Sequence, residues 1–342
     1  MKAYAPPLGG RKDYDGLLLD FNERTIPLNP KVTEALVNYF QNEKPNIYPE
    51  YEDLTAKIAE YSKVFSDQVM LTNGSDPGID LVFRCFTGVG DEVIIPTPSF
   101  AIFFQCAQVM NNKILTPEYN KNDLSFPTEK IIGLISPKTN LIVLCNPNNP
   151  TGTVIPQPEI KEILDKALEN KAIVLVDEAY FEFLQQSAAK FINDYPNLII
   201  TRTFSKAFGL AALRIGYLIS QKQNIDNMLK VRIPYDINMP AVIAASASLD
   251  NISDIENYIA EVMYSAKPKL EDFFQKKGIK YVKSGANYIL FQPPIKDLDK
   301  ILEEKGFRVR IQNKPLIDGF LRVTIGTAAQ TQKFLDFLET LI

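Results

Sequence analysis

Six short apolar runs constrain the fold more than any other feature of this chain. They are rich in Val, Ile and Leu, and they lie at 69–71, 93–95, 141–145, 173–176, 198–201 and 215–219. Several show no alternation of polar and apolar residues, which is typical of strands buried on both faces of a parallel sheet. Helical patterns such as 159–168 lie between them, as right-handed crossovers require. The pattern predicts an α/β fold with a three-layer domain on a mostly parallel sheet.

The pattern changes after about residue 239. A long helical region leads to short strands and two helices, at 288–291, 298–305, 308–311, 321–325 and about 328–342. Near the N-terminus, two prolines and two glycines predict an extended arm over the first two dozen residues, followed by a helix near 32–40. We therefore predict three parts: an arm and helix (1–45) that join the small domain, a large domain (46–238) and a small α+β domain (239–342).

The composition excludes several classes of function. The 342 residues include no histidine, which excludes Ser-His-Asp triads, Cys-His dyads and His-ligated zinc, and we predict no metal site. Acid–base chemistry must come from Lys, Asp, Glu, Tyr or Cys, or from a cofactor. The net charge is −4 and the basic residues are scattered, so we expect no nucleic-acid partner. No apolar run approaches the ~20 residues that span a bilayer, and reduced cysteines suit the cytoplasm.

Polar residues follow four of the apolar runs, where ligands bind in an open parallel sheet. These segments are 73–76, 146–152, 177–180 and 205–206. Gly74 and Ser75 precede a helical pattern, so free backbone amides there can hold a phosphate. Ser205 adds a hydroxyl and Arg214 adds a planar charge.

Two charged residues suggest a more specific chemistry. Asp177 follows a buried run, so it stays ionised only beside a cation such as a pyridinium nitrogen. Lys206 has no carboxylate in its own loop, which allows a reactive amine. Phe100 can cover a flat ring.

Each of these features also has a simpler explanation. A Gly-Ser turn commonly caps a helix, a strand-end Asp commonly forms an ion pair, a lone Lys is commonly solvated, and an aromatic residue commonly packs in the core. The segment Asn-Pro-Asn-Asn-Pro-Thr-Gly at 146–152 is more specific, because its prolines, asparagines and glycine define an unusual turn. Neither G-x-x-x-x-G-K nor G-x-G-x-x-G occurs, so common nucleotide sites have little support.

Together these segments resemble the fold-type I pyridoxal-phosphate aminotransferases over nearly the whole chain. Further matching segments lie at 48–50, 207–210, 213–217 and 321–326. Within this superfamily the chain is most similar to the histidinol-phosphate aminotransferases, through residues 205–210, 233–238, 286–288 and the pair Arg310 and Arg322.

The resemblance implies a role for each matching residue. Lys206 would bind pyridoxal 5'-phosphate as a Schiff base and move the substrate proton, while Asp177 would keep the pyridine nitrogen protonated. Asn149 and Tyr180 would contact the ring's phenolic oxygen, and Phe100 would stack on the ring. The cofactor phosphate would contact Gly74, Ser75, Asp76, Ser205 and Arg214, with Tyr48 contributed by the second subunit of a homodimer.

The same resemblance implies a substrate. Arg322 would bind the carboxylate of 2-oxoglutarate or the phosphate of L-histidinol phosphate, with Arg310 as a second phosphate contact and Asn149 and Tyr48 nearby. The expected reaction is transamination in histidine biosynthesis. Residues 22–25, Asn-Glu-Arg-Thr, replace the usual Asn-Glu-Asn-Pro, which weakens the substrate assignment. An aromatic aminotransferase, a threonine-phosphate decarboxylase and a cofactor-binding regulator without turnover stay open as alternatives.

Overall fold

A seven-stranded sheet forms the centre of the protein in the computed structural model, which describes residues 5–342. Its strand order is β2-β8-β7-β6-β5-β3-β4. The strands are β2 (Val69–Thr72), β3 (Glu92–Ile94), β4 (Lys113–Leu115), β5 (Thr139–Cys145), β6 (Ile173–Asp177), β7 (Leu198–Thr203) and β8 (Gly216–Ser220). Strands β4, β3, β5, β6 and β7 run parallel to one another, whereas β8 is antiparallel to both β7 and β2.

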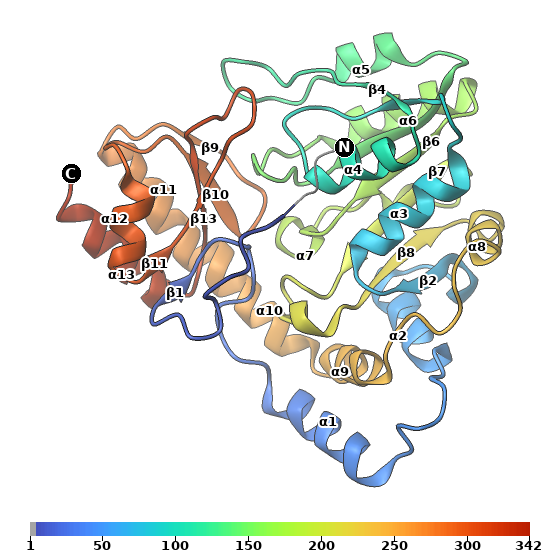
Figure 1. The fold of residues 1–342 in the computed structure, drawn as a ribbon, viewed down its shortest axis with the longest axis horizontal. Helices are drawn as coiled ribbons and strands as arrows, with labels where there is room; N and C mark the ends of the chain where they lie inside the picture. Colours follow the sequence, from blue (N-terminus) through green and yellow to red (C-terminus); the bar gives the residue numbers. More distant parts are fainter. Residues whose placement is uncertain (1–4) are drawn as a thin grey trace.

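Alternate side chains of the central strands enter two separate cores. Ile142 and Leu144 belong to one core, and Leu141 and Val143 belong to the other. Helices α2 (Glu52–Ser62), α5 (Thr128–Leu134) and α6 (Gln157–Glu169) contribute to the first core. Helices α3 (Ser75–Phe86), α4 (Ala101–Val109) and α8 (Lys222–Leu229) contribute to the second. Figure 1 shows this three-layer arrangement, which confirms the predicted α/β class.

A second, antiparallel sheet lies beside the first (Figure 1), with the order β12-β13-β10-β9. Its strands are β9 (Tyr281–Val282), β10 (Tyr288–Phe291), β12 (Arg310–Ile311) and β13 (Leu321–Thr324). Helices α11 (Lys267–Lys276), α12 (Leu298–Glu304) and α13 (Ala328–Glu339) accompany it, and α9 (Met239–Asp250) and α10 (Ile252–Ala260) connect it to the large sheet. Thr327 begins α13 with a capping box to Gln330, which satisfies two otherwise free backbone amides.

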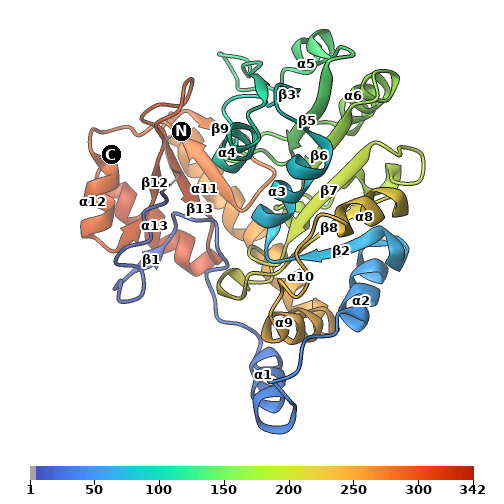
Figure 2. The same ribbon diagram turned by 45° about the vertical axis from the view of Figure 1, so that its right-hand side comes forward.

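The N-terminal segment corrects one expectation. The first two dozen residues contain a short strand, β1 (Leu17–Leu18), which pairs in parallel with β11 (Phe307–Arg308). Apolar residues at 17–19 anchor this segment, because Leu19 is buried against the C-terminal sheet. The following helix α1 (Pro30–Asn42) begins at Asn29, whose side chain accepts a hydrogen bond from the Lys31 amide. Figure 2 shows α1 projecting from the body of the molecule beside α9.

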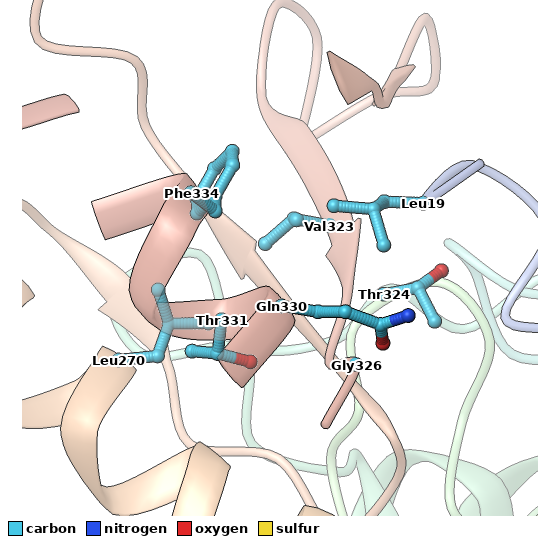
Figure 3. A pocket seen from close by; sticks show the side chains of 8 residues that line it. All are labelled: Leu19, Leu270, Val323, Thr324, Gly326, Gln330, Thr331 and Phe334. Atoms are coloured by element: carbon cyan, nitrogen blue, oxygen red, sulfur yellow. The ribbon is translucent and has the colours of Figure 1, made fainter. Parts of the chain in front are cut away.

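A small cavity lies in the C-terminal part of the molecule, away from the strand-end residues. Its volume is about 10 Å³, and it lies between α13 and β13 with Leu19 among the residues that line it, as Figure 3 shows. This volume holds one water molecule at most. No helix in the described range is long and apolar enough to cross a bilayer.

Candidate active site

The polar strand-end segments meet at one edge of the large sheet. Strands β5, β6 and β7 are parallel neighbours, so their carboxyl ends lie side by side. The 146–152 segment directly follows β5, Asp177 ends β6, and Lys206 lies three residues beyond β7. The structure therefore brings together the residues that the sequence placed at separate strand ends.

Asp177 is a buried carboxylate without an ion-pair partner in the part of the chain that the structure describes. Its side chain lies at the sheet edge with 3% relative exposure, and Oδ1 accepts a hydrogen bond from the Ala179 amide at 3.0 Å. Loss of hydration raises the pKa of Asp177 to about 7, despite the amide bond that acts in the opposite direction. The site thus disfavours a bare carboxylate and suits one that faces a cation.

Lys206 is a cation when protonated, and like Asp177 it lies in an environment that favours its neutral form. Its Nζ donates a hydrogen bond to the Phe21 carbonyl oxygen at 2.8 Å and lies 5.8 Å from the centre of the Tyr180 ring. Burial, followed by the nearby charge of Arg322, lowers the pKa of the Lys206 amine to about 8. A neutral amine is the nucleophilic form, so this environment favours covalent chemistry at Nζ.

A turn at the start of α3 can hold a phosphate group. Gly74 precedes the helix with φ 87°, and a Cβ atom there would lie 2.4 Å from an Arg214 guanidinium nitrogen. The positive φ favours glycine at this position, and the amides of Ser75 and Asp76 in the first turn of α3 have no acceptor within the helix. Arg214 also donates to the Ser205 hydroxyl at 3.4 Å, and its Nη2 lies 3.9 Å from the Asp76 carboxylate.

The 146–152 turn links this edge to the small sheet. The Asn146–Pro147 and Asn149–Pro150 peptide bonds are cis, and Asn148 is completely buried. The Asn148 amide group donates to the Pro98 carbonyl at 3.0 Å, and the Asn148 carbonyl accepts from the Tyr288 hydroxyl at 2.6 Å. The turn is therefore fixed from both sides, which orients the neighbouring Asn149.

Two arginines of the small sheet face this turn or lie beside it. Arg322 Nη1 donates to Asn149 Oδ1 at 2.6 Å, and Nη2 donates to the Asp20 carbonyl at 2.6 Å. Its Nε is buried without a hydrogen-bond partner among the described residues, so the guanidinium keeps N–H donors for an anionic ligand. Arg310 pairs directly with Arg322 across β12 and β13, so both side chains lie on the same face of that sheet.

The remaining predicted residues divide into two groups. The Tyr180 hydroxyl accepts a hydrogen bond from Asn22 at 2.9 Å and belongs to the same edge. Phe100 lies just before α4, and its ring makes an edge contact with Phe103. Tyr48 is 72% exposed and stacks on Tyr235 with ring centres 4.3 Å apart, so within one chain its contacts lie on the surface.

The sequence did not predict the backbone contacts that residues 20–22 make in the site. Carbonyl groups of Asp20 and Phe21 accept hydrogen bonds from Arg322 and Lys206, and the Asn22 carbonyl accepts one from Asn287. Backbone carbonyls leave no signature in a sequence. The only available signal was the Asn22-Glu23 match to the family, which indicates a constrained segment.

Cys145 was also missed as a site neighbour. It ends β5, and its Sγ lies 3.9 Å from Asp177 Oδ2. Its thiol is buried in the second core. The register of β5 with β6, which places Cys145 opposite Asp177, is the feature that the sequence did not reveal.

These residues fit pyridoxal phosphate. The turn at Gly74 with Arg214 and Ser205 offers a cradle for a phosphate, and the desolvated Asp177 lacks a cation that a protonated ring nitrogen would supply. The Lys206 amine is the available nucleophile for an aldehyde. The donor set therefore matches the three functional groups of this cofactor.

Comparisons with known proteins agree with this chemistry. The family described as aminotransferase class I and II matches residues 15–338. A histidinol-phosphate aminotransferase of Ruminiclostridium cellulolyticum is 34% identical over 99% of this chain and 96% of its own length. One of Methanocaldococcus jannaschii is 31% identical over 97% of this chain and 91% of its own length. The crystal structure of the histidinol-phosphate aminotransferase from Clostridium acetobutylicum has a TM-score of 0.83 and 25% identity, covering 95% and 99% of the two chains.

Proposed function

Because the chain belongs to the class I and II aminotransferases, we propose that it transfers the amino group of L-histidinol phosphate to 2-oxoglutarate, a step of histidine biosynthesis. It is a pyridoxal-phosphate-dependent enzyme. One structural observation supports the chemistry most directly: a partly buried amine and a buried carboxylate, Lys206 and Asp177, lie at the ends of adjacent parallel strands and are both shifted towards their neutral forms.

Bound pyridoxal phosphate supplies an electron sink for the negative charge that develops at the substrate Cα. We assign Asp177 to holding a proton on the pyridine nitrogen, because only a cationic nitrogen makes its buried carboxylate favourable. Lys206 Nζ would take the proton from the substrate Cα and deliver it to the cofactor carbon C4′, on the other side of the nitrogen that links substrate and cofactor. Tyr180 and Asn149 orient the ring through its phenolic oxygen.

Separate basic residues hold the cofactor phosphate and the anionic end of the substrate. Arg214, Ser205 and the amides that follow Gly74 bind the cofactor phosphate, and Phe100 covers the ring. Arg322 holds the carboxylate of 2-oxoglutarate or the phosphate of the amino donor, with its unpartnered Nε as the donor that a ligand completes. Arg310 supplies the second contact to the phosphate. One anion pocket thus serves both half-reactions, so we expect ping-pong kinetics.

We also propose a domain organisation and an assembly. Residues 46–238 form the large cofactor-binding domain, residues 239–342 form the small domain, and residues 1–45 join the small domain. The enzyme acts in the cytoplasm as a homodimer in which Tyr48 contacts the cofactor phosphate of the neighbouring subunit. The exposure of Tyr48 and of Tyr235, on which it stacks, leaves this position accessible to a second chain.

Half-reaction spectroscopy tests the substrate. The loaded enzyme is mixed with single amino donors without 2-oxoglutarate, and conversion of the cofactor to its amine form is followed by absorbance. We expect rapid conversion by histidinol phosphate, slow conversion by phenylalanine or tyrosine, and no carbon dioxide release from threonine phosphate. Faster conversion by an aromatic amino acid would refute the proposed donor, and Lys206→Ala serves as the inactive control.

A further inference from the structure

Lys314 is a partly buried lysine at the same edge that none of the roles above employs. It lies in the loop between β12 and β13, and its Nζ donates a hydrogen bond to the Ser99 carbonyl. Ser99 in turn donates its hydroxyl to Asn148 Oδ1 at 3.0 Å, next to the Asn149 that contacts Arg322. The loop therefore carries Lys314 from the small sheet onto the wall of the active site.

Three cations converge at this edge. Arg310 and Arg322 are direct cross-strand neighbours, and like charges in such a pair repel each other. The charges of Arg322 and Arg310 both act on Lys314, and after burial they lower the pKa of its amine to about 8. Among residues 5–342, no Asp or Glu forms an ion pair with Lys314. A folded protein tolerates such a cluster most readily where an anion binds.

The position of Lys314 also relates it to the reacting groups. Its charge acts on Cys145, the residue whose Sγ lies 3.9 Å from Asp177. Arg322 acts on both Lys314 and Lys206. The contact with Ser99 places the Lys314 amine beside the 146–152 turn, whose Asn149 contacts Arg322.

We propose that Lys314 is a specificity-determining residue: it is the third cation of the Arg310–Arg322 pocket and favours a dianionic phosphate monoester over a monocarboxylate. The inference deepens the proposed function, since it rests on Arg322 binding the anionic end of the substrate. A guanidinium that binds in a bidentate manner already neutralises one carboxylate. The second negative charge of a phosphate monoester is stabilised most by a further ammonium group, because the electrostatic attraction acts at short range in a pocket that is partly shielded from water.

Binding of two unreactive probes tests this role. Propyl phosphate and butyrate have similar chain lengths but differ in charge at neutral pH, and neither carries the amino group needed for reaction. Calorimetric titration of the cofactor-loaded enzyme gives both affinities. We expect Lys314→Met to weaken propyl phosphate about 10- to 100-fold, the size of one charge-assisted hydrogen bond, and to weaken butyrate less than about threefold.

Lys305→Met, at an exposed position beyond α12, is the matched control and should change neither affinity. If Lys314→Met weakened the binding of both probes equally, the proposal would be overturned. Lys314 would then have only a structural role, holding the loop against Ser99. Unchanged binding of propyl phosphate would overturn it as well.

A second measurement avoids substitution altogether. Amine acetylation followed by mass spectrometry measures the reactivity of Lys314 in the unaltered loaded enzyme at pH 8. We expect propyl phosphate to protect Lys314 at concentrations that leave Lys305 reactive, and equal acetylation with and without the ester would refute the proposal.

If the phosphate preference depends on Lys314 but histidinol phosphate is not a donor, only the proposed substrate fails. If histidinol phosphate reacts rapidly and neither measurement involves Lys314, only this inference fails.

Discussion

At the scale of single residues, the site holds two ionisable groups in energetically unfavourable surroundings. Desolvation raises the pKa of Asp177 and lowers that of Lys206. Each group therefore favours a particular ligand. The ionised carboxylate of Asp177 favours a cation, and the neutral amine of Lys206 favours an electrophilic carbon. The free energy that burial costs the cofactor-free protein is recovered on cofactor binding.

Asp177→Asn should therefore stabilise the cofactor-free protein. The folded pKa of about 7 exceeds the ordinary 3.8, so the folded state binds more protons than the unfolded state between these values, and stability falls as pH rises through that window. We expect the gain from the substitution to grow from near zero at pH 4 to about 2–4 kcal/mol above pH 7. Urea denaturation of the cofactor-free protein at several pH values measures it.

With cofactor bound, the effect of Asp177→Asn on stability should reverse. The neutral amide that Asp177→Asn introduces cannot balance the charge of the protonated ring nitrogen, so the loaded variant should be less stable than the loaded wild type at pH 8. Asp13→Asn, which alters an exposed carboxylate, controls for the loss of net charge. A variant that is less stable in both forms would contradict this explanation.

The low pKa of Lys206 predicts how cofactor attachment depends on pH. The rate of covalent attachment to the cofactor-free protein should rise about tenfold per pH unit below pH 7 and level off above the pKa of about 8. An ordinary lysine would continue to gain reactivity up to about pH 10.4. Stopped-flow absorbance after mixing with pyridoxal phosphate gives the profile. Arg322→Gln should move the midpoint upward, because the Arg322 charge helps to lower this pKa.

At the scale of elements, buried strands were the most predictable feature. All six apolar runs form strands of the large sheet, because apolar residues exposed on neither face have few alternatives to a central strand. Strand β4 (Lys113–Leu115) was missed, since an edge strand of three residues with an exposed Lys113 carries almost no pattern. The predicted run 308–311 is interrupted between β11 and β12, which pair with different sheets.

The candidate site was predictable to a similar degree. Residues that follow a buried strand, such as Asp177, could be located because parallel strands end at a common edge. Contacts that depend on a distant backbone could not: the Phe21 carbonyl that accepts from Lys206 lies 185 residues away in the chain. Lys314 was missed for the same reason, as only the β12–β13 loop conformation carries it to Ser99.

A buried ion pair fixes the strand ends behind the site. Arg202 on β7 is 1% exposed, and its Nε lies 2.9 Å from the Glu178 carboxylate that follows β6. Ser187 donates to the same carboxylate at 2.8 Å, and the Phe181 ring lies 3.6 Å from the guanidinium carbon. The network joins the residues next to Asp177 with the strand that leads to Lys206.

Arg202→Met should destabilise the protein by about 3–5 kcal/mol, because it leaves the buried Glu178 carboxylate without its cation. Thermal or urea unfolding of the loaded enzyme measures the loss. Arg84→Met removes a partner from an exposed pair with an N–O distance of 3.9 Å and should cost less than about 1 kcal/mol. Combining Arg202→Met with Glu178→Met should recover part of the stability. A double variant as unstable as the sum of both singles would contradict the ion-pair explanation.

At the scale of the whole molecule, one region exposes more apolar surface than a single chain needs. Helix α1 exposes Val37 and Phe40, and it borders a groove of about 530 Å³ lined by Leu28, Pro30, Thr33, Glu34, Val37, Asn38 and Gln41. Ile47, Tyr48, Ile233 and Tyr235 are also exposed, and the Tyr48–Tyr235 stack connects their two segments. Figure 2 shows α1 at the periphery of the body, where a second chain can reach it. Exposed apolar patches of this kind mark association surfaces.

The proposed homodimer can therefore be separated from its cofactor contact by two sets of substitutions. Val37→Asp with Phe40→Asp places charge on the exposed face of α1 and should shift the protein from twice the monomer mass to the monomer mass in analytical ultracentrifugation. Val89→Asp, at an exposed apolar residue outside these segments, should leave the dimer intact.

Tyr48→Phe keeps the apolar ring and should preserve the dimer while weakening cofactor binding about 5- to 10-fold, the size of one hydrogen bond. The α1 variant should weaken cofactor binding at least as much, because a monomer lacks the neighbouring tyrosine entirely. Undiminished cofactor affinity in a proven monomer would mean that Tyr48 acts within its own chain or not at all, and the shared active site would then be wrong even if the dimer exists.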